Sequence, residues 1–322
     1  MIKDLKQLTS GKPVTGSYLI SNVEYKPFSN KSGTFLSCEF TDMSGSIKGI
    51  MWEVKESHRA WLKSDMVVTI AGTISVFKEV PQIAINTITE CTDFDRSTLV
   101  PSLGPYQIDT IFNRLVATKV LIQNPVCRLI WDAVLSSPFV DKLKVCPGGK
   151  GTVHHAYCGG LLQHTESMVR IAGSIAAWLC LDLDVVATGC LIHDIGKIEA
   201  YKWSTAIDMT DAGRLLHHTI IGDGLILQMA QQNNISLDNA TFLKLRHIVI
   251  SHHADEGLTK PMFPEAVAVS LIDNLDATTT HAVDFASKVE NKDVGTNWTK
   301  YCQLTGRQYF VPDAATFPIE II

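Results

Sequence analysis

The spacing of apolar residues changes once along this 322-residue chain, and the change divides the sequence into two parts. From residue 13 to residue 91, apolar and polar residues alternate, and β-branched and aromatic residues are frequent. A period of two is typical of strands with one buried face. Beyond residue 104, apolar residues recur at helical spacing almost to the C-terminus. The chain therefore predicts a multidomain protein, with an all-β domain followed by an all-α domain.

The N-terminal part predicts five strands and one short helix, which lies at 54–62 between the third strand and the fourth. Five strands with a helix after the third is the element order of an OB-fold barrel, a common nucleic-acid-binding fold. We therefore predict an OB-fold nucleic-acid-binding domain at residues 1–92. Its strands are expected at 14–25, 34–41, 46–52, 67–77 and 82–89.

A segment rich in Asp, Ser, Pro and Gly follows at 93–104 and predicts a linker. Residues 105–322 predict a helical domain, because their apolar residues return at the spacing of a helix face. The expected helices span 106–122, 125–136, 160–180, 185–193, 217–233, 239–251 and 264–288.

The composition excludes several classes of protein. The sequence has no run of about eighteen apolar residues that could span a bilayer, and its N-terminus carries no apolar signal core. We therefore expect a cytoplasmic protein without a membrane partner. The eight cysteines form no Cys-x-x-Cys pair, which indicates reduced core thiols rather than a disulfide framework. The net charge of −5 argues against a protein that simply coats nucleic acid.

Histidines are concentrated in the helical part, where ten of the eleven lie between His154 and His281. Asp273 lies in an apolar stretch, where an ionisable group is rarely buried without a partner. Imidazole and carboxylate groups are the ligands of many catalytic metal ions. The helical part therefore predicts a metal-dependent hydrolase. The candidate ligands are His164, His193, Asp194, His217, His218, His252, His253 and Asp273.

The adjacent pair His193 and Asp194 constrains the geometry of such a site. On a regular helix, neighbouring side chains diverge by about 100°, so the pair can serve only a site packed between helices. There, Asp194 would bridge two ions and His193 would bind one. Two ions suit phosphoester hydrolysis, because one activates water while the other stabilises the leaving oxygen. Nitrogen and oxygen ligands without a thiolate favour two divalent ions, with Mn²⁺ first, Co²⁺, Fe²⁺ or Ni²⁺ next, and Mg²⁺ less suited.

Lys197 stands four residues after His193 and shares its helix face if the helix continues that far. In one interpretation, its ammonium group contacts a phosphate oxygen. In the other, it is a solvated lysine at a helix C-terminus, where the helix dipole also favours a cation. The spacing leaves both interpretations open.

The order His, His-Asp, His, His-His, Asp on successive helices is the signature of HD-domain phosphohydrolases, and the flanking residues are similar to those of YhaM-type 3′→5′ exoribonucleases. The resemblance covers nearly the whole chain. It is carried by His-His-Ala-Tyr-Cys-Gly-Gly-Leu-Leu-Gln-His-Thr at 154–165, His-Asp-Ile-Gly-Lys at 193–197, Gly-Arg-Leu-Leu-His-His at 213–218, Ser-His-His at 251–253 and Ile-Asp-Asn-Leu-Asp-Ala at 272–277.

This resemblance implies an OB-fold joined to an HD domain. It implies hydrolysis of single-stranded RNA to nucleoside 5′-monophosphates, and it leaves open single-stranded DNA as a substrate and self-association of the chain. It also implies that Asp194 and Lys197 are catalytic, with Lys197 on a phosphate, and that Arg214 contacts nucleic acid. His218 is preferred to His217 because the family has a Gly-His step there. The implied metal ligands are His164, His193, Asp194, His218, His252, His253 and Asp273.

Further nucleic-acid contacts are expected from aromatic and basic residues of the barrel, since OB-folds stack bases on aromatic platforms in a basic groove. The alternative for each aromatic residue is a place in the barrel core. His154 and His155, beside the glycine-rich run 147–151, are expected at the entrance to the metal site, unless that loop is simply flexible. The barrel candidates are Tyr25, Phe28, Lys31, Phe35, Lys48 and Trp52.

Two other functions are open on these observations. One is an HD phosphohydrolase that acts on a mononucleotide or cyclic nucleotide and uses the barrel for regulation. The other is a non-catalytic single-strand-binding factor whose HD domain is only structural. Product analysis separates the first from a nuclease, and the absence of any product with any metal identifies the second.

Overall fold

The computed structural model describes residues 2, 10–28, 31–43, 45–78, 80–94, 99–150, 155–203, 207–254, 257–288, 291–293 and 295–312. His154 and part of the predicted linker lie outside these residues. The chain forms two compact units, one built on a β-barrel and one on helices. The predicted order of an OB-fold barrel followed by a helical domain is confirmed.

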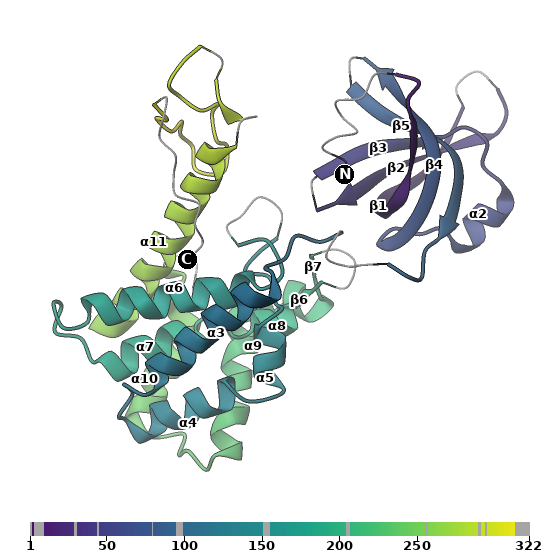
Figure 1. The fold of residues 1–322 in the computed structure, drawn as a ribbon. Helices are drawn as coiled ribbons and strands as arrows, with labels where there is room; N and C mark the ends of the chain where they lie inside the picture. Colours follow the sequence, from purple (N-terminus) through teal and green to yellow (C-terminus); the bar gives the residue numbers. More distant parts are fainter. Residues whose placement is uncertain are drawn as a thin grey trace. The chain divides into compact units, whose positions relative to one another are not determined.

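The N-terminal unit is a closed barrel with the strand order β1-β2-β3-β5-β4 (Figure 1). Antiparallel pairing joins each neighbouring pair except β3 and β5, which are parallel, and β1 closes the barrel against β4. The elements are β1 (Pro13–Pro27), β2 (Thr34–Asp42), β3 (Gly45–Met51), α2 (Glu56–Trp61), β4 (Met66–Phe77) and β5 (Val80–Glu90).

Alternate residues along each strand are apolar, and their side chains fill the interior of this barrel. On β2, Leu36, Cys38 and Phe40 point inward and are buried, because successive side chains on a strand face opposite sides. Phe40 is fully buried, whereas Phe35, on the opposite face, is only half-buried. One aromatic residue of this strand therefore belongs to the core and the other does not.

Among its described residues, the helical unit contains the seven predicted helices and four short elements that the sequence pattern did not predict. These are the helices α5 (Phe139–Leu143) and α8 (Lys197–Ala200) and the strands β6 (Tyr201–Lys202) and β7 (Asp208–Met209), all too short to show a period. The predicted helices are α3 (Pro105–Lys119), α4 (Pro125–Val134), α6 (Gly160–Ile175), α7 (Leu183–Ile192), α9 (Asp211–Gln232), α10 (Ala240–Ser251) and α11 (Pro264–Ser287).

The start of α9 was predicted six residues too late. The helix begins after Thr210, whose side chain accepts a hydrogen bond from the Gly213 backbone N–H at 3.0 Å. Such a cap satisfies one of the free N–H groups of the first turn. The apolar pattern gave no sign of this first turn, because its sequence, Asp-Ala-Gly-Arg, contains a single small apolar side chain, Ala212.

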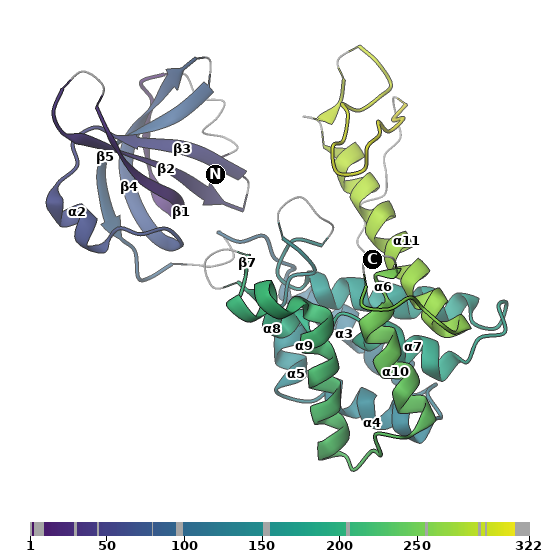
Figure 2. The ribbon, with the colours of Figure 1, turned by 180° about the vertical axis from the view of Figure 1, so that it is seen from behind.

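Helix α7 lies at the centre of the unit and contacts α4, α6, α10 and α11 (Figure 1). Every residue from Val185 to Ile192 is buried, as expected for a helix that is apolar on all sides. Figure 2 shows α9 and α10 side by side. Since α7 ends at Ile192, His193 and Asp194 follow at the buried end of the most enclosed helix.

The helices and the cysteines bear on the expectations about membranes and disulfides. Within the described part of the chain, every helix is too short or too polar to span a bilayer. All eight cysteines are free thiols, and six of them are buried.

The turn after α7 packs directly against α9, and only glycine fits at the contact. A Cβ atom on Gly196 would lie 1.9 Å from the His218 carbonyl oxygen and 2.5 Å from the Gly222 nitrogen. Both of these are backbone atoms, which cannot move aside without shifting the helix.

We predict that Gly196→Ala lowers the free energy of unfolding by about 3 kcal/mol, as severe overpacking does. Urea denaturation of the metal-free protein measures this loss. Gly173→Ala is the matched control, since no atom lies within 4 Å of its added Cβ. The control should gain about 0.5–1 kcal/mol from helix propensity. Equal stability of the two variants would contradict the contact.

Candidate metal centre

Two histidines of the cluster occupy the same structural position, the C-cap of a helix. His193 caps α7 and His252 caps α10. Each Nδ1 lies 2.9 Å from the carbonyl oxygen three residues earlier, on Cys190 and Val249 respectively. A carbonyl only accepts, so each Nδ1–H donates to one of the unpaired carbonyls of the helix end. The neutral ring then carries its lone pair on Nε2.

His164, on α6, is oriented by a carboxylate in place of a carbonyl. Its Nδ1 lies 2.7 Å from Asp276 Oδ2, on α11. Its Nε2 lies 3.2 Å from both His193 Nε2 and Asp273 Oδ1. A carboxylate that orients an imidazole in this way is the usual outer partner of a metal-binding histidine.

Asp194 lies between two groups of imidazoles. Its Oδ2 is 3.2 Å from His193 Nε2. Its Oδ1 is 3.2 Å from His218 Nε2 and 3.7 Å from His252 Nε2. Lys197 Nζ contacts Oδ2 at 2.6 Å and donates a second hydrogen bond to the Gly148 carbonyl at 2.7 Å. The two oxygens of one buried carboxylate therefore serve two different groups of nitrogen atoms.

The arrangement fits divalent cations by two criteria. First, Asp194 Oδ1 and His252 Nε2 are buried and have no hydrogen-bond partner among the described residues, which is costly unless another ligand is present. Second, atoms that are each about 2.1 Å from one ion, at right angles, lie about 3.0 Å apart. Ligand atoms within 4.8 Å of one another occur in the groups His164, His193, Asp273 and Asp194, His218, His252.

Burial and charge set the protonation states that such ligands need. Burial strongly lowers the pKa of His252, and it lowers the pKa of His218 to about 4 despite the nearby Asp194. Both rings are therefore neutral at physiological pH. Burial would raise the pKa of Asp194, but the ammonium of Lys197 and the imidazole of His193 outweigh it and hold that pKa far below its usual range. The Lys197 pKa is raised in return, since Asp194 outweighs desolvation.

His164 has the opposite shift. Burial acts to lower its pKa, but hydrogen bonds to Asp273 and Asp276 outweigh burial and raise the pKa to about 9. The ring is therefore protonated near neutral pH in the metal-free protein, and its second proton occupies the position where a cation would accept the Nε2 lone pair.

We predict that binding of Mn²⁺ at pH 8 releases about one proton from His164, because a ligating imidazole must be neutral. Affinity should rise about tenfold for each pH unit up to pH 9 and then level off. Calorimetric titrations in buffers with different ionisation enthalpies measure the proton count.

Asp276→Asn should reduce this proton release, since it removes a charge that raises the pKa of His164. Ser167→Ala is the control, because Ser167 contacts Asp276 through a neutral hydroxyl. Mn²⁺ binding without any proton release at pH 8 would contradict the protonated state of His164.

Asp276 is the residue of this centre that sequence reasoning missed. It accepts hydrogen bonds from His155 Nε2 at 3.0 Å, from His164 Nδ1 at 2.7 Å and from the Ser167 hydroxyl. The available signal was its position three residues after Asp273, which places both carboxylates on one helix face.

His155 was expected to contact nucleic acid, and the structure places it in the interior. Only 3% of the residue is exposed. Its Nε2 contacts Asp276, and its Nδ1 lies 2.9 Å from the Tyr157 hydroxyl. A surface role does not fit a buried ring whose two nitrogens both have partners within the protein. His154, expected to act with it, lies outside the described residues.

Lys197 and Arg214 differ in accessibility. Lys197 is buried at the first position of α8, so the solvated lysine considered from the sequence is wrong. Arg214 is exposed at the start of α9 and pairs with Asp208 at 3.0 Å. An exposed pair of this kind contributes little stability, so the guanidinium can exchange this partner for a phosphate.

Three of the predicted aromatic residues form a cluster on the barrel. The Phe28 and Phe35 ring centroids lie 5.5 Å apart, and Trp52 is 6.2 Å from Phe28 and 5.2 Å from Phe35. The Lys31 ammonium lies 4.2 Å from the centroid of Phe28. Trp52 is 53% exposed, so a face of the cluster is accessible to a ligand.

The other two barrel candidates have different surroundings. The Tyr25 ring packs against the barrel core, and its hydroxyl is buried. This is the core alternative that the sequence left open. Lys48 lines a surface groove of about 370 Å³ together with Lys26, Glu24 and Glu39. Two carboxylates in this groove offset the two ammonium groups, so it is not a strongly basic surface.

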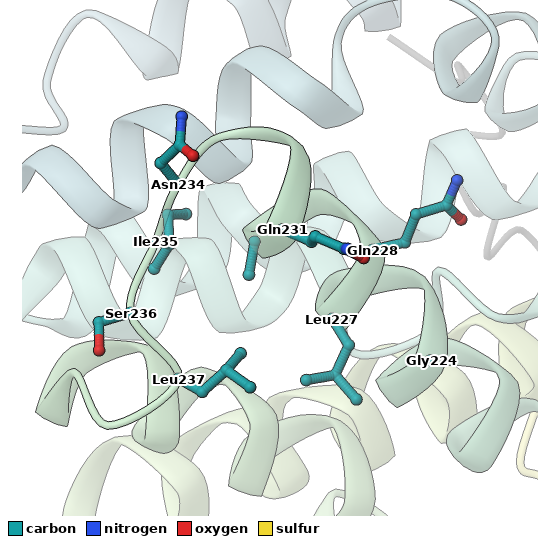
Figure 3. Close-up of a pocket in the computed structure, with 9 residues that line it drawn as sticks. Gly224, Leu227, Gln228, Gln231, Asn234, Ile235, Ser236 and Leu237 are labelled. Atoms are coloured by element: carbon teal, nitrogen blue, oxygen red, sulfur yellow. The ribbon is translucent and has the colours of Figure 1, made fainter.

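A larger groove, of about 780 Å³, lies between the second half of α9 and the residues that follow it (Figure 3). Leu227, Ile235 and Leu237 line it together with the amides of Gln228, Gln231 and Asn234. None of its lining residues is ionisable, so this groove has no group for acid-base or metal chemistry.

Comparisons with known proteins agree with this geometry. The HD domain family matches residues 161–278, and a family of OB-fold nucleic acid binding domains matches residues 19–90. A relative from Shouchella clausii (strain KSM-K16), named 3'-5' exoribonuclease YhaM, is 27% identical over 333 residues, which cover 100% of both chains. A relative with the same name from Bacillus subtilis (strain 168) is 25% identical over 81% of this chain and 83% of its own.

The predicted resemblance to YhaM-type exoribonucleases is therefore confirmed over the length of the chain. So is the prediction of an enzyme of the HD superfamily with an N-terminal OB-fold. The HD match spans all the histidines and carboxylates of the centre from His164 to Asp273.

Proposed function

We propose that this chain is a 3′→5′ exoribonuclease that hydrolyses single-stranded RNA, with single-stranded DNA as a second substrate, to nucleoside 5′-monophosphates. It uses two divalent cations, Mn²⁺ first among them. The 3′→5′ polarity rests on the resemblance to the YhaM relatives, since no distance within the centre distinguishes one end of a strand from the other.

The position of Asp194 is the observation that carries this proposal. One buried carboxylate lies 3.2 Å from His193 on one side and 3.2 Å from His218 on the other. This arrangement would allow one carboxylate to hold two cations, and two cations would activate water and stabilise the leaving oxygen in phosphodiester hydrolysis. A purely structural domain would have no use for imidazoles gathered on both sides of one buried carboxylate.

The cations supply a water molecule of lowered pKa and positive charge for the phosphate oxygens. The proposed ligands are His164, His193, Asp194, His218, His252, His253 and Asp273, which come from α6, α9, α11 and the ends of α7 and α10. The C-cap hydrogen bonds of His193 and His252 hold their Nε2 atoms toward the centre before any cation arrives. Preorganised ligands of this kind need no rearrangement when substrate binds.

Lys197 has two roles in this proposal. Its ammonium neutralises Asp194, which keeps the bridging carboxylate ionised in the interior. The same ammonium group could also donate a hydrogen bond to a phosphate oxygen of the substrate. The Gly148 carbonyl holds Nζ in place for either contact.

We propose that the barrel binds the strand by stacking bases on the Phe28, Phe35 and Trp52 cluster. Base stacking on aromatic side chains contributes about 1–3 kcal/mol per base and tolerates any sequence. Lys31, beside Phe28, adds a positive charge for the backbone.

We predict that Trp52→Ala weakens binding of a single-stranded RNA oligomer by about tenfold, the loss expected for one stacked base. Fluorescence anisotropy with chelator present measures binding without cleavage. Phe77→Ala is the matched control, because Phe77 is also an exposed barrel aromatic beside a lysine, Lys78. If both variants bind the RNA oligomer equally well, the cluster of Phe28, Phe35 and Trp52 does not stack the bases.

We predict that Asp194→Asn abolishes digestion of RNA in the presence of Mn²⁺. The rate should fall by more than about 100-fold, since even outer partners of a metal cost 10–100-fold. The assay follows one oligomer labelled at its 3′ end and the same oligomer labelled at its 5′ end. The wild-type protein should release the 3′ label first, as a mononucleotide.

Asp238→Asn, on an exposed loop, serves as the control and should digest normally. Unchanged digestion by Asp194→Asn would refute the site. An oligomer that survives while a mononucleotide is hydrolysed would identify the chain as a phosphohydrolase of small substrates. Binding of RNA without product in any divalent metal would identify a binding factor.

A further inference from the structure

Helix α9 contains a break at His217, where φ is 65° and ψ is 149°. Side chains rarely adopt this region, because a Cβ atom crowds the neighbouring peptide groups, and glycine is its usual occupant. His217 is exposed, so burial of its ring does not hold it there. Conformations of this kind gather at active sites and ligand sites, where the local geometry has a function.

The break turns His217 toward the same cluster that its neighbour reaches. On a regular helix, His217 and His218 would diverge by about 100°. Instead, their ring centroids lie 4.1 Å apart, and His217 is 5.7 Å from His253. His217 Nδ1 also lies 3.1 Å from the Thr219 hydroxyl oxygen, a contact that orients the ring.

These three imidazoles have the spacing of ligands around one ion. One nitrogen of each lies within 4.8 Å of the others, and His218 Nε2 is 3.0 Å from His253 Nε2. Two nitrogens about 2.1 Å from one ion, at right angles, are separated by about 3.0 Å. A ligand set of imidazoles alone favours transition-metal ions over Mg²⁺ or Ca²⁺.

We propose that His217 is a further ligand of the outer of the two proposed cation sites, where it joins His218 and His253 around one divalent transition-metal cation. The proposal rests on the metal-dependent nuclease function and adds His217 to its ligands. Because His217 is exposed, the site is accessible to solvent and to a phosphate group of the substrate. The strained backbone at His217 is then the cost of directing a second, adjacent imidazole to the cation.

The test titrates the metal-free full-length chain with Co²⁺ alone and counts the bound ions. We expect His217→Gly and His217→Ala each to weaken the most weakly bound Co²⁺ by about tenfold or more, while the tightest Co²⁺ is unchanged. Leu216→Ala, which changes the neighbouring exposed side chain, should bind as wild type does. In chelator, only His217→Gly should melt higher than wild type, by about 2 °C or more, because glycine relieves the strain that alanine retains.

Each other outcome has a definite meaning. Wild-type Co²⁺ affinity in both His217 variants overturns the outer site and leaves the proposed function standing. Weaker binding in the alanine variant alone also overturns it, since the backbone rather than the ring would be responsible. Unchanged Co²⁺ binding with a raised KM for RNA would make His217 a substrate contact. A wild-type chain that binds no Co²⁺ contradicts the metal-dependent function itself.

Discussion

The helical unit depends on keeping the Asp194 carboxylate ionised inside the protein. Removing a charge from water costs several kcal/mol, and losing one partner of a buried pair costs about 3–5 kcal/mol. Lys197 neutralises this carboxylate at 2.6 Å, and the imidazoles of His193 and His218 lie 3.2 Å from its two oxygens. The close contact at Gly196 is part of the same arrangement, because it lets α9 approach the turn that carries Asp194. The packing of the Gly196 turn against α9 and the neutralisation of Asp194 therefore depend on each other.

The proposed metal centre brings adjacent residues to one place by interrupting helices. A regular helix separates neighbouring side chains by about 100°, yet the cluster uses three adjacent pairs. His193 and Asp194 follow the end of α7, and His252 and His253 follow the end of α10. His217 and His218 lie at the break inside α9. The end of a helix also leaves carbonyl groups without partners, and these carbonyls orient the imidazoles. The same helix ends therefore place the ligands and set their orientation.

Much of the fold followed from short-range patterns. The five barrel strands were predicted within two residues at each end, because alternation and turn residues are local signals. The long helices were predicted for the same reason. The start of α9 was missed, since its first turn has a single small apolar side chain, Ala212, and depends on the Thr210 cap. The short elements α5, α8, β6 and β7 hold too few residues to show a period.

The sequence by itself determined the two fold classes and the inventory of imidazoles and carboxylates, since periodicity and residue type are properties of neighbours along the chain. Only the tertiary structure decided their roles. It buried His155 against Asp276, paired Lys197 with Asp194, left Trp52 at the surface and turned His217 toward His218. These outcomes depend on contacts between helices distant in sequence, and on helix ends whose direction is set by packing. No pattern of nearest neighbours contains that information.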